Sequence, residues 1–184
     1  GCPYKCTFCS HHYGYGANLR KRAPADVVAE IKSLYDKYGI REIQFEDPSF
    51  TCAPGHVKEI CRLIKKSGLK INWNCNVRAN TSGEELFREM SEAGCRRVLL
   101  GVESGSQEML DSMKKGVTLE QIRNTVRLAA KYKMRVNAAF ILGTPGETFE
   151  TARKTFDFAR ELDPDYVMFS VYIPSVGGEL FENL

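Results

Sequence analysis

The chain has 184 residues, of which 43% are hydrophobic and 27% charged, a composition typical of a globular protein with one core. Its 26 Lys and Arg against 23 Asp and Glu give a net charge of +3, without the basic excess that predicts nucleic-acid binding. The apolar runs are far shorter than the roughly 20 residues of a membrane-spanning helix, so we expect no membrane span.

The seven cysteines are unevenly placed: three cluster within residues 2–9 and four are scattered. An odd number at such spacing is not typical of a disulfide-stabilised secreted scaffold and favours a reducing environment. We therefore expect a cytoplasmic protein. Because the sequence begins at Gly1 and not at Met, we also expect it to be part of a longer chain.

The first motif along the chain has three cysteines in eight residues, Cys2-Pro3-Tyr4-Lys5-Cys6-Thr7-Phe8-Cys9. Three thiolates at this spacing can bind one face of a 4Fe–4S cube and leave one iron open to a small molecule. The alternative is zinc, because His11 or His12 could complete a tetrahedral site of three cysteines and one histidine.

Helix-like and strand-like hydrophobic periods then alternate. Pro24 and Gly39 suit the two ends of a first helix over 25–38, and capping boxes at Ser82/Glu85 and Thr118/Gln121 predict two later helix starts. The predicted strands span 42–46, 70–76, 98–102, 136–142 and 166–173. The predicted helices span 25–38, 54–67, the segment after Ser82 that ends at Gly94, 107–114, the segment after Thr118, and a last helix with Phe149, Ala152, Phe156 and Ala159 on one face.

Successive strands are far enough apart in sequence for a helix between each pair, which is typical of parallel strands. No linker or low-complexity tract interrupts the alternation. Residues 1–184 are therefore predicted to form one α/β domain, either a barrel or a doubly wound sheet. Polar segments follow each predicted strand, and in both architectures this carboxyl rim collects the loops of a site.

The cysteine motif, Cys-x3-Cys-x2-Cys with an aromatic residue before the last cysteine, resembles the signature of the radical S-adenosylmethionine (radical SAM) superfamily. The likeness extends over essentially the whole chain. Within the superfamily, the chain looks most like the branch whose members often carry a cobalamin-binding domain. Methylthiotransferases and coproporphyrinogen-type enzymes are relatives of this branch. The segments that carry it, after the cysteines, are 43–51, 76–80, 101–106, 140–147 and 172–174.

This resemblance implies a partial TIM-like (βα)6 barrel whose first strand lies before Gly1. It also implies a 4Fe–4S cluster that cleaves SAM reductively to a 5′-deoxyadenosyl radical, for a methyl transfer or cyclisation linked to cobalamin in a domain outside this chain. A methylthiotransferase core is the alternative within the superfamily, and a zinc-stabilised binding module without catalysis is the alternative of another class. A flavodoxin or ferredoxin would be the reductant, and the exposed edge strand should promote self-association.

The resemblance also assigns residues. Cys2, Cys6 and Cys9 would bind the cluster, and no catalytic residue is assigned beyond it. The residues expected to bind SAM are Phe8, Asp47, Arg78, Glu103, Tyr172 and Ile173.

Each SAM-binding role has a physical basis. The Phe8 backbone would lie beside the adenine, although its ring could simply pack under the loop. Asp47 suits the SAM ammonium and Arg78 its carboxylate, unless the two pair with each other; other branches place Gly-Gly-Glu where this chain has Glu46-Asp47-Pro48.

Three further assignments belong to later strand ends. Glu103 would accept hydrogen bonds from the ribose, as a rim carboxylate whose truncation leaves stability unchanged. Main-chain groups of Tyr172 and Ile173 would meet the adenine edge. The Pro145-Gly146 pair favours a type II turn, whose contact with SAM would be secondary.

Overall fold

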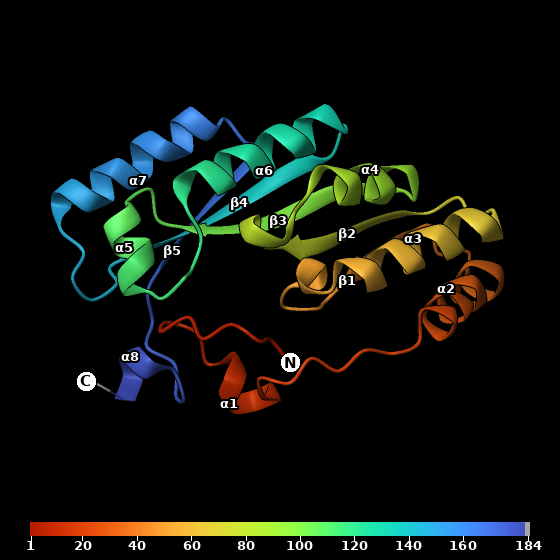
Figure 1. Ribbon diagram of the computed structural model, residues 1–184, viewed down its shortest axis with the longest axis horizontal. Coiled ribbons are helices and arrows are strands. Elements are labelled where there is room, and N and C mark those ends of the chain that lie inside the picture. Colours follow the sequence, from red (N-terminus) through yellow and green to blue (C-terminus); the bar gives the residue numbers. More distant parts are fainter. Residues whose placement is uncertain (183–184) are drawn as a thin grey trace.

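The computed structural model describes residues 1–182, apart from the side chain of His12. One sheet of five parallel strands runs in the order β1-β2-β3-β4-β5 (Figure 1). This open, curved sheet confirms the predicted partial barrel, with five strands in the described residues. The strands are β1 (Glu42–Phe45), β2 (Asn72–Val77), β3 (Cys95–Glu103), β4 (Arg135–Leu142) and β5 (Tyr166–Val171).

Helices cover one face of the sheet, and the amino-terminal segment crosses the other side together with two short helices (Figure 1). The covering helices are α2 (Pro24–Tyr38), α3 (Pro54–Ser67), α4 (Glu84–Glu92), α6 (Leu119–Lys131) and α7 (Phe149–Leu162), with the short α5 (Gln107–Ser112) after β3. The two short helices on the other side, α1 (His11–Tyr15) and α8 (Glu179–Glu182), were not predicted. None of the helices in residues 1–182 combines the length and the apolar character that crossing a membrane requires.

Three of the predicted helix-end signals are confirmed, and the first is Pro24 at the start of α2. Gly39 follows α2 in the left-handed conformation, at φ 67°, and Thr118 with Gln121 forms the capping box of α6. The predicted capping box at Ser82/Glu85 is wrong, because Gly83 is the N-cap of α4 and the Ser82 hydroxyl donates 2.8 Å to the Arg78 carbonyl. A short 3-10 helix over Ala79–Thr81 lies between Arg78 and α4. Its turn directs the Ser82 hydroxyl to the Arg78 carbonyl and not to the first turn of α4.

The expected apolar face of α7 is confirmed only in part, because Ala159 is buried but the two phenylalanines of that face are not. Phe149 is 87% exposed and Phe156 45% exposed, whereas Thr155 and Phe158 are buried. The reason is a close approach at Gly105 after β3, whose N–H donates 3.0 Å to the Thr155 hydroxyl. A side chain there would collide with the α7 backbone at Lys154 and Thr155, so this glycine decides which face of α7 is buried.

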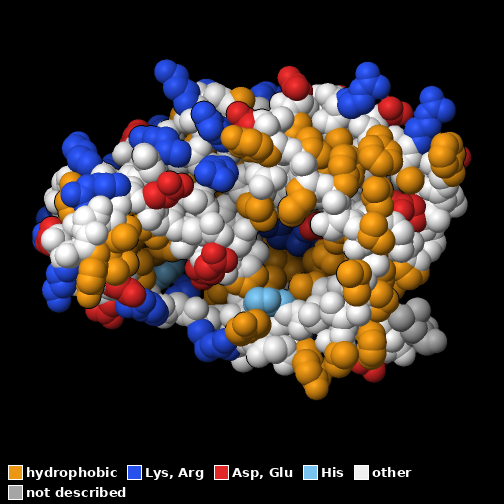
Figure 2. Space-filling model, turned by 180° about the vertical axis from the view of Figure 1, so that it is seen from behind, with side chains coloured by type: hydrophobic (Ala, Val, Ile, Leu, Met, Phe, Trp, Pro, Cys, Tyr) orange, Lys and Arg blue, Asp and Glu red, His pale blue; other side chains and the backbone are white. Residues whose placement is uncertain are grey.

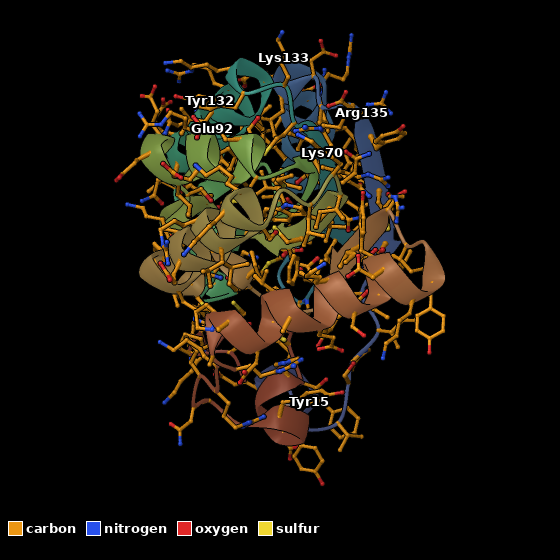
Figure 3. All side chains as sticks on the ribbon, turned by 90° about the vertical axis from the view of Figure 1, so that its right-hand side faces the viewer. Tyr15, Lys70, Glu92, Tyr132, Lys133 and Arg135 are labelled. Carbon is orange, nitrogen blue, oxygen red and sulfur yellow. The ribbon has the colours of Figure 1, made fainter. Side chains whose placement is uncertain are left out.

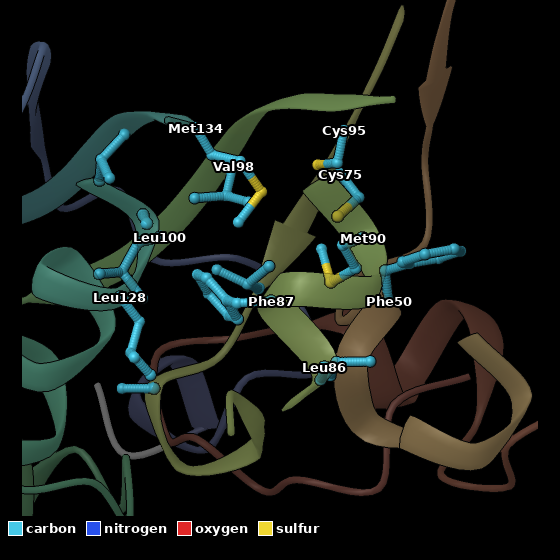
Figure 4. Close-up of a cluster of buried hydrophobic side chains, with 14 of the residues drawn as sticks. Phe50, Cys75, Leu86, Phe87, Met90, Cys95, Val98, Leu100, Leu128 and Met134 are labelled. Atoms are coloured by element: carbon cyan, nitrogen blue, oxygen red, sulfur yellow. The ribbon is translucent and has the colours of Figure 1, made fainter. Parts of the chain in front are cut away.

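The hydrophobic core lies between the sheet and its covering helices (Figure 4). Trp73, Leu100 and Phe140 come from three neighbouring strands, and Phe87 from α4 packs against them with no more than 1% exposure for any of the four. Cys75 and Cys95 lie side by side in this core on adjacent strands (Figure 4). Burial of this kind positions the strand ends, where the site residues lie.

The opposite face of the sheet is open and carries one row of polar side chains. Gln44, Asn74, Arg97 and Arg135 lie in one row across β1 to β4, and each is the register partner of the next. The space-filling view shows a hollow at the centre of the uncovered face, with hydrophobic side chains gathered along one side (Figure 2). This hollow side of the partial barrel is where a small molecule has access.

Candidate functional site

The cysteine loop lies at the carboxyl ends of the strands. In the side view, Tyr15 of α1 stands at one end of the molecule, and Lys70 and Arg135, at the beginnings of β2 and β4, stand at the other (Figure 3). The loop is anchored through Thr7, whose N–H donates 2.9 Å to the Met113 carbonyl and whose carbonyl accepts from Leu180 at 3.0 Å. The main chain therefore presents the three cysteines to the rim that also collects the strand ends.

A pocket of about 230 Å³ lies between this loop and the strand ends. Cys2, Cys6 and Cys9 all line it, so residues from one short segment converge on one space. The other lining residues come from the same loop, from α1 and from the segments at or after β1 to β4: Tyr4, Phe8, His11, Pro48, Ser49, Asn76, Val77, Arg78, Leu99, Gly101, Glu103, Lys115 and Ala139.

The donor set suits a 4Fe–4S cluster. Within residues 1–182, no three His, Cys, Asp or Glu side chains are grouped tightly enough to hold one metal ion. Ligands of one zinc ion must crowd around a single point, whereas thiolates bound to three irons of a cube stand further apart. Three soft thiols that face one pocket without meeting at a point are suited to the larger group.

The zinc alternative depended on a nearby histidine. The backbone N–H of His11 donates to the Cys9 sulfur at 3.4 Å, and the His11 ring stacks on Tyr15 with centroids 4.6 Å apart. The side chain of His12 lies outside the described part of the structure. Burial raises the pKa of the Cys9 thiol, which makes the neutral form more stable until a cation is bound.

Arg78 is buried beside the cysteine loop, with 6% exposure. Its guanidinium carbon lies 3.8 Å from the centre of the Tyr4 ring, its Nε donates to Asn80 Oδ1 at 3.0 Å, and its Nη1 lies 3.6 Å from the Cys6 sulfur. Arg78 therefore makes these contacts and not the pairing with Asp47 that was left open from the sequence.

Glu103 ends β3 in an unusual conformation. Its φ is 69°, in the left-handed region, and the register between β3 and β4 shifts between Gly101 and Glu103. Its carboxylate accepts a hydrogen bond from Lys115 Nζ at 2.6 Å, and the two side chains are 10% and 8% exposed. Strained backbone and buried charge both cost free energy, and they cluster at functional sites.

The buried pair corrects one expectation and adds one residue. Glu103 was expected to be a rim carboxylate of little consequence for stability, but it is a buried partner of an ion pair. Lys115 was not predicted as a site residue. It lies twelve residues further along the chain, after α5, and no periodicity of the sequence connects it to a carboxylate at the end of β3.

The remaining predicted site residues are divided between the pocket and its surroundings. Phe8 lines the pocket, and its ring centre lies 5.7 Å from Lys115 Nζ. Asp47 is exposed and lines a neighbouring groove between α2 and β1. Tyr172 and Ile173 line neither space; the Tyr172 N–H donates 2.7 Å to the Leu142 carbonyl, and Ile173 is 77% exposed.

The turn after β4 has the predicted geometry. Gly146 has φ 86°, and the Glu147 N–H donates 3.0 Å to the Thr144 carbonyl, as a type II turn requires. The four remaining cysteines lie outside the pocket. Cys61, Cys75 and Cys95 are buried in the core, where burial raises the pKa of the Cys61 thiol to about 12 and that of Cys75 well above its ordinary value.

Comparison with known proteins gives a consistent set of similarities. Residues 1–159 match the family described as the Radical SAM superfamily. An uncharacterized methyltransferase of Pyrococcus horikoshii is 37% identical over 182 residues, which are 99% of this chain and 40% of that protein. An anaerobic magnesium-protoporphyrin IX monomethyl ester cyclase of Rubrivivax gelatinosus is 31% identical, over 100% of this chain and 33% of that protein.

A solved structure agrees with these sequence matches. The radical S-adenosylmethionine methyltransferase TsrM from Kitasatospora setae, with cobalamin and a 4Fe–4S cluster bound, superimposes with a TM-score of 0.93 at 26% identity. The match covers 98% of this chain and 37% of that one. This chain thus spans 40% or less of the length of each of these proteins.

Proposed function

Because the chain belongs to the radical SAM superfamily, we propose that it binds a 4Fe–4S cluster through Cys2, Cys6 and Cys9 and cleaves SAM reductively beside it. One observation carries the proposal. The three thiols of one loop line the same pocket as the buried Glu103–Lys115 pair, at the carboxyl ends of parallel strands. Soft ligands for iron and charged groups for a zwitterionic cofactor are thereby gathered in one space.

When bound, the cluster supplies the electron that cleaves the sulfonium of SAM to methionine and a 5′-deoxyadenosyl radical. The chain's own residues bind and orient the cofactor. Glu103 accepts hydrogen bonds from the ribose hydroxyls, and Lys115 holds that carboxylate in place. Arg78 is the second cation of the pocket and suits the SAM carboxylate.

Three further assignments complete the proposed SAM site. The backbone of Phe8 lies beside the adenine, and main-chain groups of Tyr172 and Ile173 meet its edge. Asp47 reaches the SAM ammonium from the neighbouring groove that it lines. These roles require SAM to extend from the cysteine pocket along the rim of the sheet.

The net reaction is a methyl transfer or a cyclisation linked to cobalamin. Support comes from relatives named as a methyltransferase and a cyclase, and from the similar structure that holds cobalamin with its cluster. Because this chain corresponds to 40% or less of those proteins, the cobalamin domain and the groups that select the substrate belong to other parts of the whole protein. A flavodoxin or ferredoxin of the cytoplasm supplies the electron.

The test is anaerobic reconstitution with iron and sulfide, followed by metal analysis and an assay for 5′-deoxyadenosine under dithionite. We expect about four irons per chain. Replacement of Cys2, Cys6 or Cys9 by alanine should abolish the cluster, whereas Cys61→Ala should retain it, since Cys61 lies in the core away from the pocket.

Two outcomes contradict the proposal. Wild-type iron content in Cys6→Ala would refute the ligand assignment. Stoichiometric zinc with no cleavage of SAM would favour the binding module without catalysis. The cobalamin content of the purified full-length protein distinguishes a methylthiotransferase from a cobalamin-linked enzyme, since a methylthiotransferase would carry no cobalamin.

A further inference from the structure

Arg78 lies in direct contact with the cysteine motif. Its Nη1 lies 3.6 Å from the sulfur of Cys6, within hydrogen-bond range of a sulfur acceptor. The side chain comes from the residue directly after β2, 72 positions along the chain from Cys6. A buried guanidinium that reaches so far across the site must be held there by other groups.

Two contacts hold the guanidinium in place. It stacks on the Tyr4 ring at 3.8 Å, and its Nε donates to Asn80 Oδ1 at 3.0 Å. Asn80 is itself fixed, because its Nδ2 donates 3.1 Å to the Gly116 carbonyl. The planar fork of Arg78 is thereby oriented from two sides, and Nη1 is left to face the thiol.

No carboxylate of the described chain offsets the charge of Arg78 within the pocket. The other lysine or arginine that lines it, Lys115, is paired at 2.6 Å with Glu103, the pocket's one lining carboxylate among residues 1–182. That pair is neutral as a unit. Arg78 donates to an amide oxygen and a sulfur, so until the SAM carboxylate is bound its positive charge acts on the cysteine loop without a compensating anion.

From this geometry we propose that Arg78 is a positioning residue that donates a charge-assisted hydrogen bond to the Cys6 sulfur and raises the reduction potential of the cluster bound there. The inference rests on the proposed function and adds to it a control of electron entry. Reduction places one more negative charge on the cluster and its thiolates. A fixed cation and an N–H···S bond stabilise that more negative state, so reduction becomes easier.

The test measures the midpoint potential of the reconstituted cluster by titration with mediators, followed by electron paramagnetic resonance. Arg78→Met should lower the potential, with at least a tenfold fall in the ratio of reduced to oxidised cluster at a fixed potential, equivalent to about 59 mV for one electron. Arg78→Lys retains the charge but not the fork, so its potential should lie between those of the wild type and the methionine variant.

Two further variants separate this effect from others. Arg153→Met removes the same charge from α7, where the side chain is 75% exposed and lies outside the cysteine pocket, so the potential should not move. Asn80→Ala removes the group that orients Arg78 and should shift the potential in the same direction as Arg78→Met, by a smaller amount. Iron content is measured in every variant.

The outcomes are distinct. Full iron content with a wild-type potential in Arg78→Met overturns the inference and leaves the proposed function intact. If Arg78→Met fails to hold iron, the lysine and Asn80→Ala variants decide: wild-type potentials in both overturn the inference, and lowered potentials support it. Absence of iron from the wild-type protein after reconstitution would instead contradict the proposed function itself.

Discussion

The carboxylate of Glu103 and the ammonium of Lys115 lie 2.6 Å apart and are almost completely removed from water. The pair is assembled over Gly101, because a side chain at that position would place its Cβ 2.4 Å from Glu103 Oε1 and 3.0 Å from Lys115 Nζ. One glycine in β3 thus creates the room for two charges at the end of the same strand. The relationship has consequences for both stability and cofactor binding.

Removal of one member of the pair should destabilise the protein. In Glu103→Ala the Lys115 ammonium stays buried without its partner, and breaking a buried pair in this way costs about 3–5 kcal/mol. We expect a lower free energy of unfolding of the apo protein, measured by urea denaturation. An unchanged free energy would mean that Lys115 finds another partner or reaches water.

The matched control removes both charges. Glu103→Gln with Lys115→Met leaves no uncompensated ion, so the double variant should recover most of the stability that each single variant loses. SAM affinity separates stability from function, since the double variant should fold and still bind SAM at least tenfold more weakly. Wild-type affinity in that protein would remove Glu103 from the cofactor site.

Gly101→Ala should displace the pair without changing either charge. We expect weaker SAM binding together with a loss of stability, because the Cβ meets the Glu103 carboxylate and the tip of Lys115. Gly55→Ala on α3 is the matched control: nothing lies within 4 Å of its Cβ, and alanine in a helix should stabilise by up to about 1 kcal/mol. Equal behaviour of the two variants would contradict the close approach.

Much of the fold could be predicted because local signals and tertiary structure agree. The α3 helix spans the predicted residues, and the predicted strands all exist with ends within a few residues of those observed. Some helix signals act only on the backbone of neighbouring residues, so they can be recognised from the local sequence alone. They are proline at the start of a helix, glycine after its end and the Thr118 capping box. The parallel order of the sheet followed from the helix between each pair of strands.

The misplaced features depend on contacts between distant segments. Periodicity indicates that α7 has an apolar face, but the approach of Gly105 decides which side is buried. The pairing of Lys115 with Glu103 and the contact of Arg78 with Cys6 require the folded chain, because no local pattern relates these residues. The three cysteines, by contrast, lie within one loop, which is why spacing alone could group them.

The cysteines of the core should be chemically inert in the folded protein. Burial raises the pKa of Cys61 to about 12, so at pH 8 the reactive thiolate is scarce, and the side chain is inaccessible. We expect iodoacetamide to modify Cys2 in the apo protein at pH 8 and to leave Cys61 unmodified, as read by mass spectrometry of peptides. Because the pKa is raised, reactivity of Cys61 should increase as the pH rises toward 12.

Unfolding provides the control for this experiment. In urea all seven thiols should react, since burial no longer protects any of them. Modification of Cys61 in the folded state as fast as that of Cys2 would contradict its placement in the core.

The β1 edge of the sheet should promote self-association. Within residues 1–182, β1 pairs with β2 alone, and beside it lies a groove of about 440 Å³ lined by apolar side chains such as Val27, Ile31 and Phe45. An unpaired edge next to apolar surface is a template for another strand. The resemblance to the superfamily places a further strand before Gly1, so the protein extended by about ten natural upstream residues should be more monomeric.

Sedimentation equilibrium over a range of concentrations measures the effect, and an extension of equal length made of glycine and serine is the matched control. Only the natural extension should weaken association, because glycine and serine cannot fill the apolar groove beside β1. The other edge offers a competing surface, since Val171 on β5 is 76% exposed. If both extensions leave association unchanged, the contact is assigned to β5. If the protein without any extension is monomeric at every concentration, the β1 edge does not mediate self-association.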